Sequence, residues 1–140
     1  MKFLRALLIL WIVIIVQSCD CYQKQIGENY FIRCIDVRES MSIGFGTEVG
    51  NEGIVDQTVF EAHWNDDYIL AKRHPLEAPG IDGINREITE YYILKKVKFG
   101  EAKASQNMFG PLTKEEYINK KKELGLIESE MESISFDDLK

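Results

Sequence analysis

The sequence FEAHWNDDYILAKR, residues 60–73, contains two runs of alternating apolar and polar residues around three turn-forming residues. Successive side chains of a strand point to opposite faces, so Phe60, Ala62 and Trp64 share one face of the first run. Residues of the types found at 65–67 bond to nearby backbone amides and favour tight turns. The pattern therefore predicts a β-hairpin, which we expect at the centre of an antiparallel sheet.

A turn at residues 65–67 also predicts which hairpin residues lie opposite each other. The predicted pairs are Trp64 with Tyr68, His63 with Ile69, and Thr58 with His74. The two histidines are then five residue steps apart along the ladder, more than ~15 Å at the rise of a strand. We therefore predict two surface histidines that do not share a metal ion.

Segments on both sides of the hairpin continue the strand pattern. The other predicted strands are 30–36, 40–46 and 88–97, rich in β-branched and aromatic residues. The segments predicted as loops, with glycine, proline and polar residues, are 47–56, 76–87 and 99–107. In the second strand, Met41, Ile43 and Phe45 fall on one face, which we expect to be buried.

A helix is predicted after residue 112. Thr113 at the N-cap and Glu116 three residues later form a capping-box pattern. Gly125 fits the C-terminal position that favours a left-handed backbone. The chain is therefore expected to be α+β: an antiparallel β-meander of about five strands with a C-terminal α-helix packed on it, preceded by a signal peptide.

The segment 127–140 is acidic and has two open readings. Ile127, Met131 and Ile134 would align on a helix, whereas Ile134 and Phe136 would align on a strand. We expect the last few residues to be loose. The predicted single α+β domain is therefore 30–126, followed by an acidic tail.

The amino terminus has the order of parts of a secretory signal. Lys2 and Arg5 precede an apolar run of 11 residues, 6–16, which is too short to span a bilayer as a helix. The following sequence VQSC, residues 16–19, resembles the lipobox of bacterial lipoproteins. This resemblance implies cleavage after residue 18 and a diacylglycerol, together with an acyl chain such as palmitate, on Cys19.

A lipid on Cys19 implies attachment to the cell membrane or the outer membrane on an extracytoplasmic side, because two or more chains give stable anchoring. Residues 19–29 would then be a tether. Cys21 and Cys34 remain as an even pair in a compartment where disulfides persist. Two readings stay open: a Cys21–Cys34 disulfide, or a free thiol at Cys21 and a buried apolar Cys34.

Four segments together resemble a known family. They are WNDDYILAK at 64–72, YYIL at 91–94, FGPLTKEEY at 109–117 and KELGL at 122–126. They are similar to a family of small bacterial lipoproteins known as a domain of unknown function. The resemblance implies no activity, ligand or catalytic residue.

Three groups of residues are candidates for chemistry besides the histidines. Asp66 and Asp67 are interpreted as turn formers rather than as an acid–base or calcium pair. An aromatic set, interpreted as core rather than as a ligand platform, comprises Trp64, Tyr68, Tyr91, Tyr92 and Phe109. The three cysteines lack a zinc-site spacing. We predict no catalytic residue, no cofactor and no metal.

The charge of the chain excludes one class of partner. The full chain carries 17 basic and 23 acidic residues, a net charge of −6. Removing residues 1–18 takes away Lys2 and Arg5, which leaves 15 basic and 23 acidic residues, or −8. Nucleic-acid binders usually carry a basic stripe, so we predict no nucleic-acid partner.

We expect a non-enzymatic binding or assembly module with an envelope protein partner. The alternatives are an inhibitor or immunity-type protein against a basic secreted hydrolase, and an unrecognised envelope hydrolase.

Overall fold

The computed structural model describes residues 21–47, 50–98 and 103–140. The predicted signal peptide and Cys19 lie outside the described residues. The strands are β1 (Gln23–Gly27), β2 (Tyr30–Arg33), β3 (Ser42–Thr47), β4 (Gly50–Val55), β5 (Val59–Trp64), β6 (Tyr68–Arg73), β7 (Glu90–Lys95), β8 (Met108–Leu112) and β9 (Glu132–Ser135). The helices are α2 (Lys114–Leu124) and the short 3₁₀ turns η1 (Arg38–Ser40), η2 (Ile81–Gly83), η3 (Ala104–Asn107) and η4 (Glu128–Glu130).

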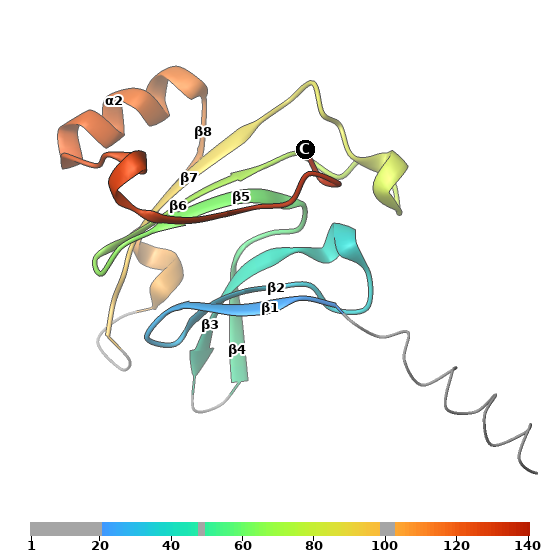
Figure 1. The fold of residues 1–140 in the computed structure, drawn as a ribbon, viewed down its shortest axis with the longest axis horizontal. Coiled ribbons are helices and arrows are strands. Elements are labelled where there is room, and N and C mark those ends of the chain that lie inside the picture. The colour runs from blue at the N-terminus through green and yellow to red at the C-terminus, as the bar shows by residue number, and fades with distance from the viewer. Residues whose placement is uncertain (1–20, 48–49, 99–102) are drawn as a thin grey trace, which may run out of the picture.

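The strands form two antiparallel sheets. One has the order β1-β2-β3-β4 and the other the order β8-β7-β6-β5-β9. Figure 1 shows the two sheets facing each other, with α2 on the outer side of the five-stranded sheet. The predicted α+β class with a C-terminal helix is therefore confirmed, but the single meander is in fact two sheets. Among the described residues, no helix combines the length and the apolar character needed to cross a bilayer.

The main core lies between the two sheets. Met41, Ile43 and Phe45 are buried in it, as the alternation of β3 predicts. Ala62 and Trp64 of β5 enter the same core from the other sheet. A second, smaller core on the outer face of the five-stranded sheet contains Leu70, Ile93 and Tyr117, and it joins α2 to that sheet.

The central hairpin is confirmed, but its predicted register is wrong by one residue. Trp64 pairs with Ile69 and His63 with Leu70. The backbone N–H of Asn65 donates to the carbonyl of Tyr68 at 3.1 Å, so only residues 66–67 lie outside the ladder. The Asn65 side chain accepts bonds from the two following amides at 3.0 and 2.8 Å, which closes this tighter turn.

The far end of the hairpin keeps the predicted pairing. A bulge between Val59 and Glu61 shifts the register back. The N–H of His74 therefore donates to the carbonyl of Thr58 at 3.4 Å. His63 pairs with Leu70, so four residue steps separate the two histidines along the second strand of the hairpin and five along the first, which contains the bulge.

Two segments predicted without strands contribute to the sheets. The predicted loop 47–56 contains β4, whose Ile54 and Val55 are buried while its glycines pair with β3. The approach to the helix is β8, which pairs with β7. Both are weak β-formers by composition, and pairing with a neighbouring strand determines their conformation.

The predicted tether and tail are also wrong for the described residues. Within 19–29, β1 pairs with β2, and Ile26 is buried. Within 127–140, β9 pairs with β5, and Leu139 is fully buried. The strand reading of the tail is therefore correct. Both segments bury apolar side chains in the main core, so they belong to the same folded unit as 30–126.

Helix α2 begins and ends as the sequence predicts. The Thr113 hydroxyl accepts a bond from the N–H of Glu116 at 3.3 Å, and the Glu116 carboxylate accepts one from the N–H of Thr113 at 2.8 Å. Gly125 has a φ of 67°, in the left-handed region that favours glycine. The N–H of Leu126 then donates to the carbonyl of Lys121 at 2.9 Å, which completes the C-terminal cap.

Candidate functional site

The most concentrated group of ionisable side chains lies on the outer face of the five-stranded sheet. Glu61 and His63 alternate along β5 with residues of the main core, so both point away from that core. Lys72 lies opposite Glu61 on β6. Glu128 comes from η4, directly before β9 returns the chain to β5. We call Glu61, His63, Lys72, Lys121 and Glu128 the polar cluster.

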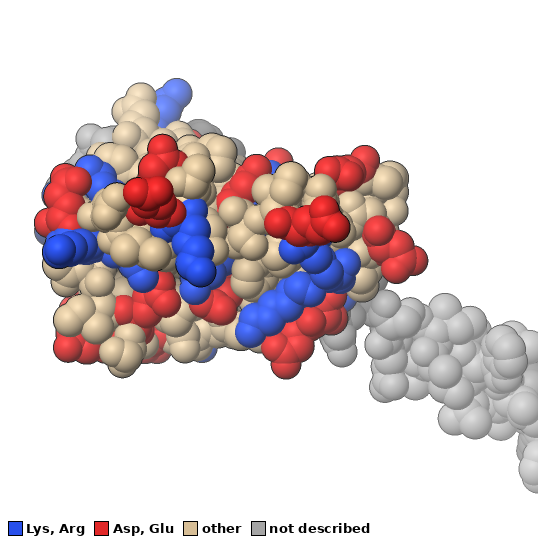
Figure 2. Space-filling view, turned by 90° about the horizontal axis from the view of Figure 1, so that it is seen from above, with Lys and Arg blue, Asp and Glu red and all other residues tan. Residues whose placement is uncertain are grey.

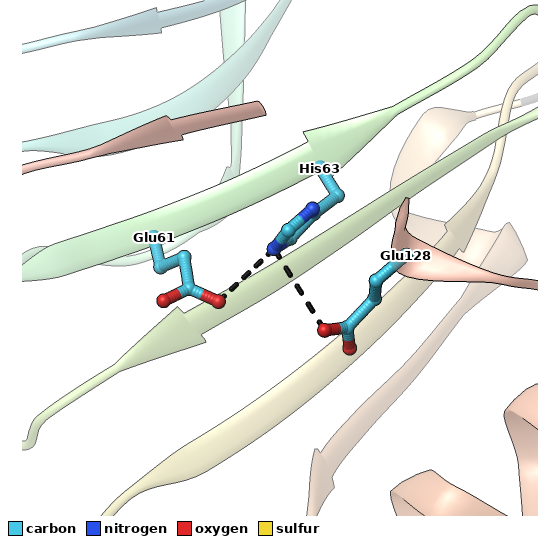
Figure 3. Close-up of side chains that lie close together, drawn as sticks. All are labelled: Glu61, His63 and Glu128. Atoms are coloured by element: carbon cyan, nitrogen blue, oxygen red, sulfur yellow. Dashed lines mark hydrogen bonds and ion pairs between the residues drawn. The ribbon is translucent and has the colours of Figure 1, made fainter. Parts of the chain in front are cut away.

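Figure 3 shows how the histidine of the polar cluster lies between two carboxylates. His63 Nε2 is 3.0 Å from Glu61 Oε1 and 3.8 Å from Glu128 Oε2. Lys72 Nζ is 2.5 Å from Glu61 Oε1 and 3.6 Å from Glu128 Oε2. Lys72 therefore contacts both acids, and each acid contacts more than one partner.

Helix α2 completes the cluster from above the sheet. Lys121 Nζ is 2.6 Å from Glu128 Oε1. The Tyr117 hydroxyl donates to the same oxygen at 2.7 Å. Lys121 Nζ also lies 4.5 Å from the centre of the Tyr117 ring. Glu128 consequently links α2, η4 and the central strands in one network.

The electrostatics of the cluster follow from partial burial and close pairing. Burial opposes the charge on Glu128, but hydrogen bonds from Lys121 and Tyr117 and the charge of Lys72 outweigh it and lower the pKa of Glu128 to about 2. Burial likewise opposes ionisation of Glu61, and bonds from Lys72 and His63 hold its pKa below the ordinary value. The pKa of Lys72 is raised, because its bonds to the two acids exceed the effect of burial.

Three residues of the cluster offer ligand atoms that are close enough together for a metal ion. One ligand atom each from Glu61, His63 and Glu128 lie within 4.8 Å of one another. The two carboxylates, however, already accept bonds from lysines: Glu61 from Lys72 and Glu128 from Lys121. A divalent cation would have to compete with these two ammonium groups for the carboxylates. The residues present therefore fit an ion-pair network better than a metal centre.

The cluster also lacks the arrangement expected for nucleophilic catalysis. Among the described residues, the hydrogen bonds of the cluster join carboxylates, lysines, His63 and the Tyr117 hydroxyl, and they include no serine, threonine or cysteine. The Tyr117 hydroxyl is a poor nucleophile here, since burial and its bond to Glu128 raise the pKa of the phenol. The other ring nitrogen of His63, Nδ1, is buried and has no hydrogen-bond partner among the described residues.

The second histidine is not at the surface, contrary to the prediction. His74 is 6% exposed. Its ring stacks on Phe60 with centroids 4.4 Å apart, and Nδ1 lies 2.7 Å from the carbonyl oxygen of Ile88. His63, which is partly buried in the polar cluster, is not a free surface residue either. The partners that bury each imidazole ring come from other parts of the chain, so the hairpin sequence alone wrongly predicts two surface histidines.

The other predicted candidates occupy structural positions. Asp66 and Asp67 form the exposed hairpin turn, as predicted, although Asn65 supplies the bonds that close it. The aromatic set divides between the two faces of the sheet. Trp64 and Tyr92 lie in the main core, Tyr68 and Tyr91 border the smaller core, and Phe109 is exposed beneath Lys120. These side chains do not form one platform.

The cysteines resolve one open alternative. Cys21 and Cys34 are joined by a disulfide, with their Cα atoms 5.4 Å apart. The N–H of Cys34 donates to the carbonyl of Tyr22 at 2.9 Å, so a backbone hydrogen bond and the disulfide both join residues 21–22 to Cys34. Cys21 is thereby fixed to the end of β2.

The sequence alone indicates only part of the polar cluster. The alternation that puts Phe60, Ala62 and Trp64 on one face of the strand puts Glu61 and His63 on the other, and Lys72 follows in the partner strand of the hairpin, so the sequence indicates this half. Glu128 is not indicated, because its position depends on the path of the tail. Lys121 was assigned to the helix, but its partner was unknown for the same reason.

A comparison with known families identifies the chain. A family model described as protein of unknown function (DUF3997) matches residues 27–139. The chain belongs to the DUF3997 family. The matched range includes β2 to β9 and α2, so it contains the five-stranded sheet, three strands of the four-stranded sheet and the complete polar cluster. No curated protein and no solved structure matched the chain.

Proposed function

We propose that this DUF3997 protein is a lipid-anchored, extracytoplasmic, non-enzymatic module that binds another envelope protein. The observation that carries the proposal is the sequence VQSC at residues 16–19, directly after a positive segment and an 11-residue apolar run. Acylated Cys19 would hold the domain on the cell membrane or the outer membrane.

The disulfide supports the extracytoplasmic part of the proposal. Cys21 and Cys34 are bonded within a regular ladder. Such bonds persist in oxidising compartments and are rare in the cytosol. A protein exported through a lipoprotein signal would meet the conditions in which this disulfide forms.

The polar cluster has a role in the fold that does not depend on catalysis. Its carboxylates are already paired with lysines, and its histidine lies between them. These contacts join α2, η4 and the sheet, so the cluster stabilises the fold that presents the surface. The hydrolase alternative would require a nucleophile beside His63.

The anchoring and the partner are tested together in cells of a bacterium that encodes the protein. Wild type and Cys19→Ala are expressed, and membrane and soluble fractions are separated before chemical cross-linking and affinity capture. We expect wild type in the membrane fraction with a reproducible cross-linked protein, and Cys19→Ala released from it. Wild type in the soluble fraction contradicts the anchor, and repeated capture without a specific partner contradicts the binding role.

The charge of the mature chain favours a second candidate, an inhibitor of a basic secreted hydrolase. After removal of residues 1–18 the net charge is −8. Figure 2 shows acidic and basic side chains interspersed on one face rather than a continuous acidic patch, so this candidate ranks second. Binding to a basic hydrolase that is lost at high salt would favour it, because exposed charge pairs are screened.

A further inference from the structure

Cys21 lies against the turn that follows β2. Cys21 is bonded to Cys34, the residue that follows β2. Cys21 Sγ is also 3.5 Å from the carbonyl oxygen of Val37. Figure 1 shows that the turn after β2 and the η2 loop project at the same end of the molecule as the first described residues.

This turn exposes two apolar side chains. Ile35 is 55% exposed and Val37 is 49% exposed. Ser40 fixes the backbone between them: its hydroxyl accepts a bond from the N–H of Ile35 at 2.8 Å and lies 2.6 Å from the carbonyl oxygen of Val37. The turn therefore has a defined shape that holds both side chains outward.

The apolar surface continues onto a neighbouring loop. Val37 lines an open hollow of about 400 Å³ together with Leu76, Ala78 and Pro79. Ile81, in η2 just beyond that loop, is also exposed. We call Ile35, Val37 and Ile81 the apolar end.

The charges near the apolar end do not form a basic patch. Asp36 is exposed between the two apolar side chains, and Glu39 lines the hollow. The Arg38 guanidinium makes two 2.9 Å bonds to the carboxylate of Asp138, which neutralises it. A surface that docks here would therefore be held by apolar contact and not by attraction between opposite charges.

The short length of chain between Cys19 and Cys21 indicates that the bilayer covers the apolar end. Two residue steps span at most ~7 Å of extended chain. If Cys19 carries acyl chains in the bilayer, Cys21 lies at the interface, and the disulfide brings the turn after β2 with it. We propose that Ile35 and Val37 contact the lipid bilayer, at the boundary between headgroups and acyl chains, and that this contact orients the domain. The inference rests on the proposed anchoring at Cys19.

The proposal is tested on the full, acylated protein in vesicles of zwitterionic phosphatidylcholine. A tryptophan reporter is introduced by Val37→Trp, with Ile118→Trp as the matched control, since Ile118 is 50% exposed on α2. Native Trp64 is buried in both variants, and Trp11 belongs to the predicted signal peptide. Lipids brominated near the top of the acyl chains serve as the quencher.

We expect brominated lipid to quench the reporter at position 37 and not the reporter at 118, because interfacial side chains reach ~5–10 Å into this boundary. The quenching should be the same at low and high salt. Equal emission in brominated and ordinary vesicles at position 37, or equal quenching at both positions, overturns the proposal.

Two further measurements distinguish a failure of the bilayer contact from a failure of the lipid anchor and from binding of a protein partner. The mass of the same protein reports the lipid on Cys19: a lipidated protein without quenching at position 37 refutes the bilayer contact alone, whereas an unmodified protein refutes the anchor and the contact together. A photo-cross-linker at position 37 in native membranes should label lipid. A discrete protein adduct in its place would assign the apolar end to a protein partner and overturn the proposal.

Discussion

Replacing Glu128 with glutamine removes the charge that joins α2 and η4 to the central strands. The carboxylate accepts bonds from Lys121 at 2.6 Å and Tyr117 at 2.7 Å and lies 3.6 Å from Lys72. Glu128→Gln keeps the shape of the side chain but leaves the two ammonium groups without this partner. We expect it to lower the free energy of unfolding.

The size of the effect follows from the pKa of Glu128. The pKa falls from 4.5 to about 2 because the bonds from Lys121 and Tyr117 outweigh the opposing effect of burial. That difference corresponds to an upper bound of ~3 kcal/mol of stabilisation. The side chain is 26% exposed, so solvent screening reduces our expected value to about 1–2 kcal/mol.

The same reasoning gives a pH dependence with a definite sign. A carboxylate with a depressed folded-state pKa stabilises the protein above its unfolded pKa, and this stabilisation is lost as the pH falls through the folded value. The contribution of Glu128 should therefore be complete at pH 7 and decline between pH 4.5 and about 2. Glu61, whose pKa is also lowered, should add to the loss of wild-type stability in acid.

Urea unfolding of wild type and Glu128→Gln at pH 7 and pH 3 measures both quantities. The matched control is Glu123→Gln, which removes an exposed helix partner of Lys120 and should change stability by less than about 0.5 kcal/mol. A Glu128→Gln protein as stable as wild type at pH 7 would refute the reasoning. So would a difference between the two proteins that stays the same at pH 3.

Three other substitutions test separate parts of the fold. Cys21→Ala should lower the free energy of unfolding by about 3 kcal/mol in the chain-entropy model, and a reductant should lower the melting temperature of wild type but not of the variant; equal melting temperatures would contradict a structural disulfide. Thr113→Ala should cost about 1 kcal/mol in urea unfolding, since it removes the N-cap of α2, and no change would mean that the cap is not formed in solution. Leu139→Ala should cost about 2–5 kcal/mol, because the side chain is fully buried, whereas a loose tail predicts no measurable loss.

Local patterns were sufficient for the elements that depend on neighbouring residues. The β5–β6 hairpin, the buried face of β3 and both caps of α2 depend on alternation, turn chemistry and capping residues within a few positions. The register failed because a three-residue and a two-residue turn are both compatible with the same asparagine and aspartates. The Asn65 side chain closes the shorter one.

The elements that were missed depend on distant partners. Three strands form only because a neighbouring strand pairs with them: β1 pairs with β2, β4 with β3, and β9 with β5. The sequences of β1, β4 and β9 contain too many polar or small residues to indicate a strand. Only the return of the tail beside β5 brings Glu128 to His63. The polar cluster was therefore half predictable, from β5 and β6, and half dependent on the tertiary path of residues 127–140.

Intact mass spectrometry of the mature protein tests the proposed lipid anchor on Cys19. Wild type purified from membranes and Cys19→Ala are compared. We expect mature wild type to begin at Cys19 and to carry the added mass of a diacylglycerol and an acyl chain, and Cys19→Ala to carry none. A wild-type protein that is unmodified at Cys19 would contradict the anchor and, with it, the orientation of the apolar end toward the bilayer.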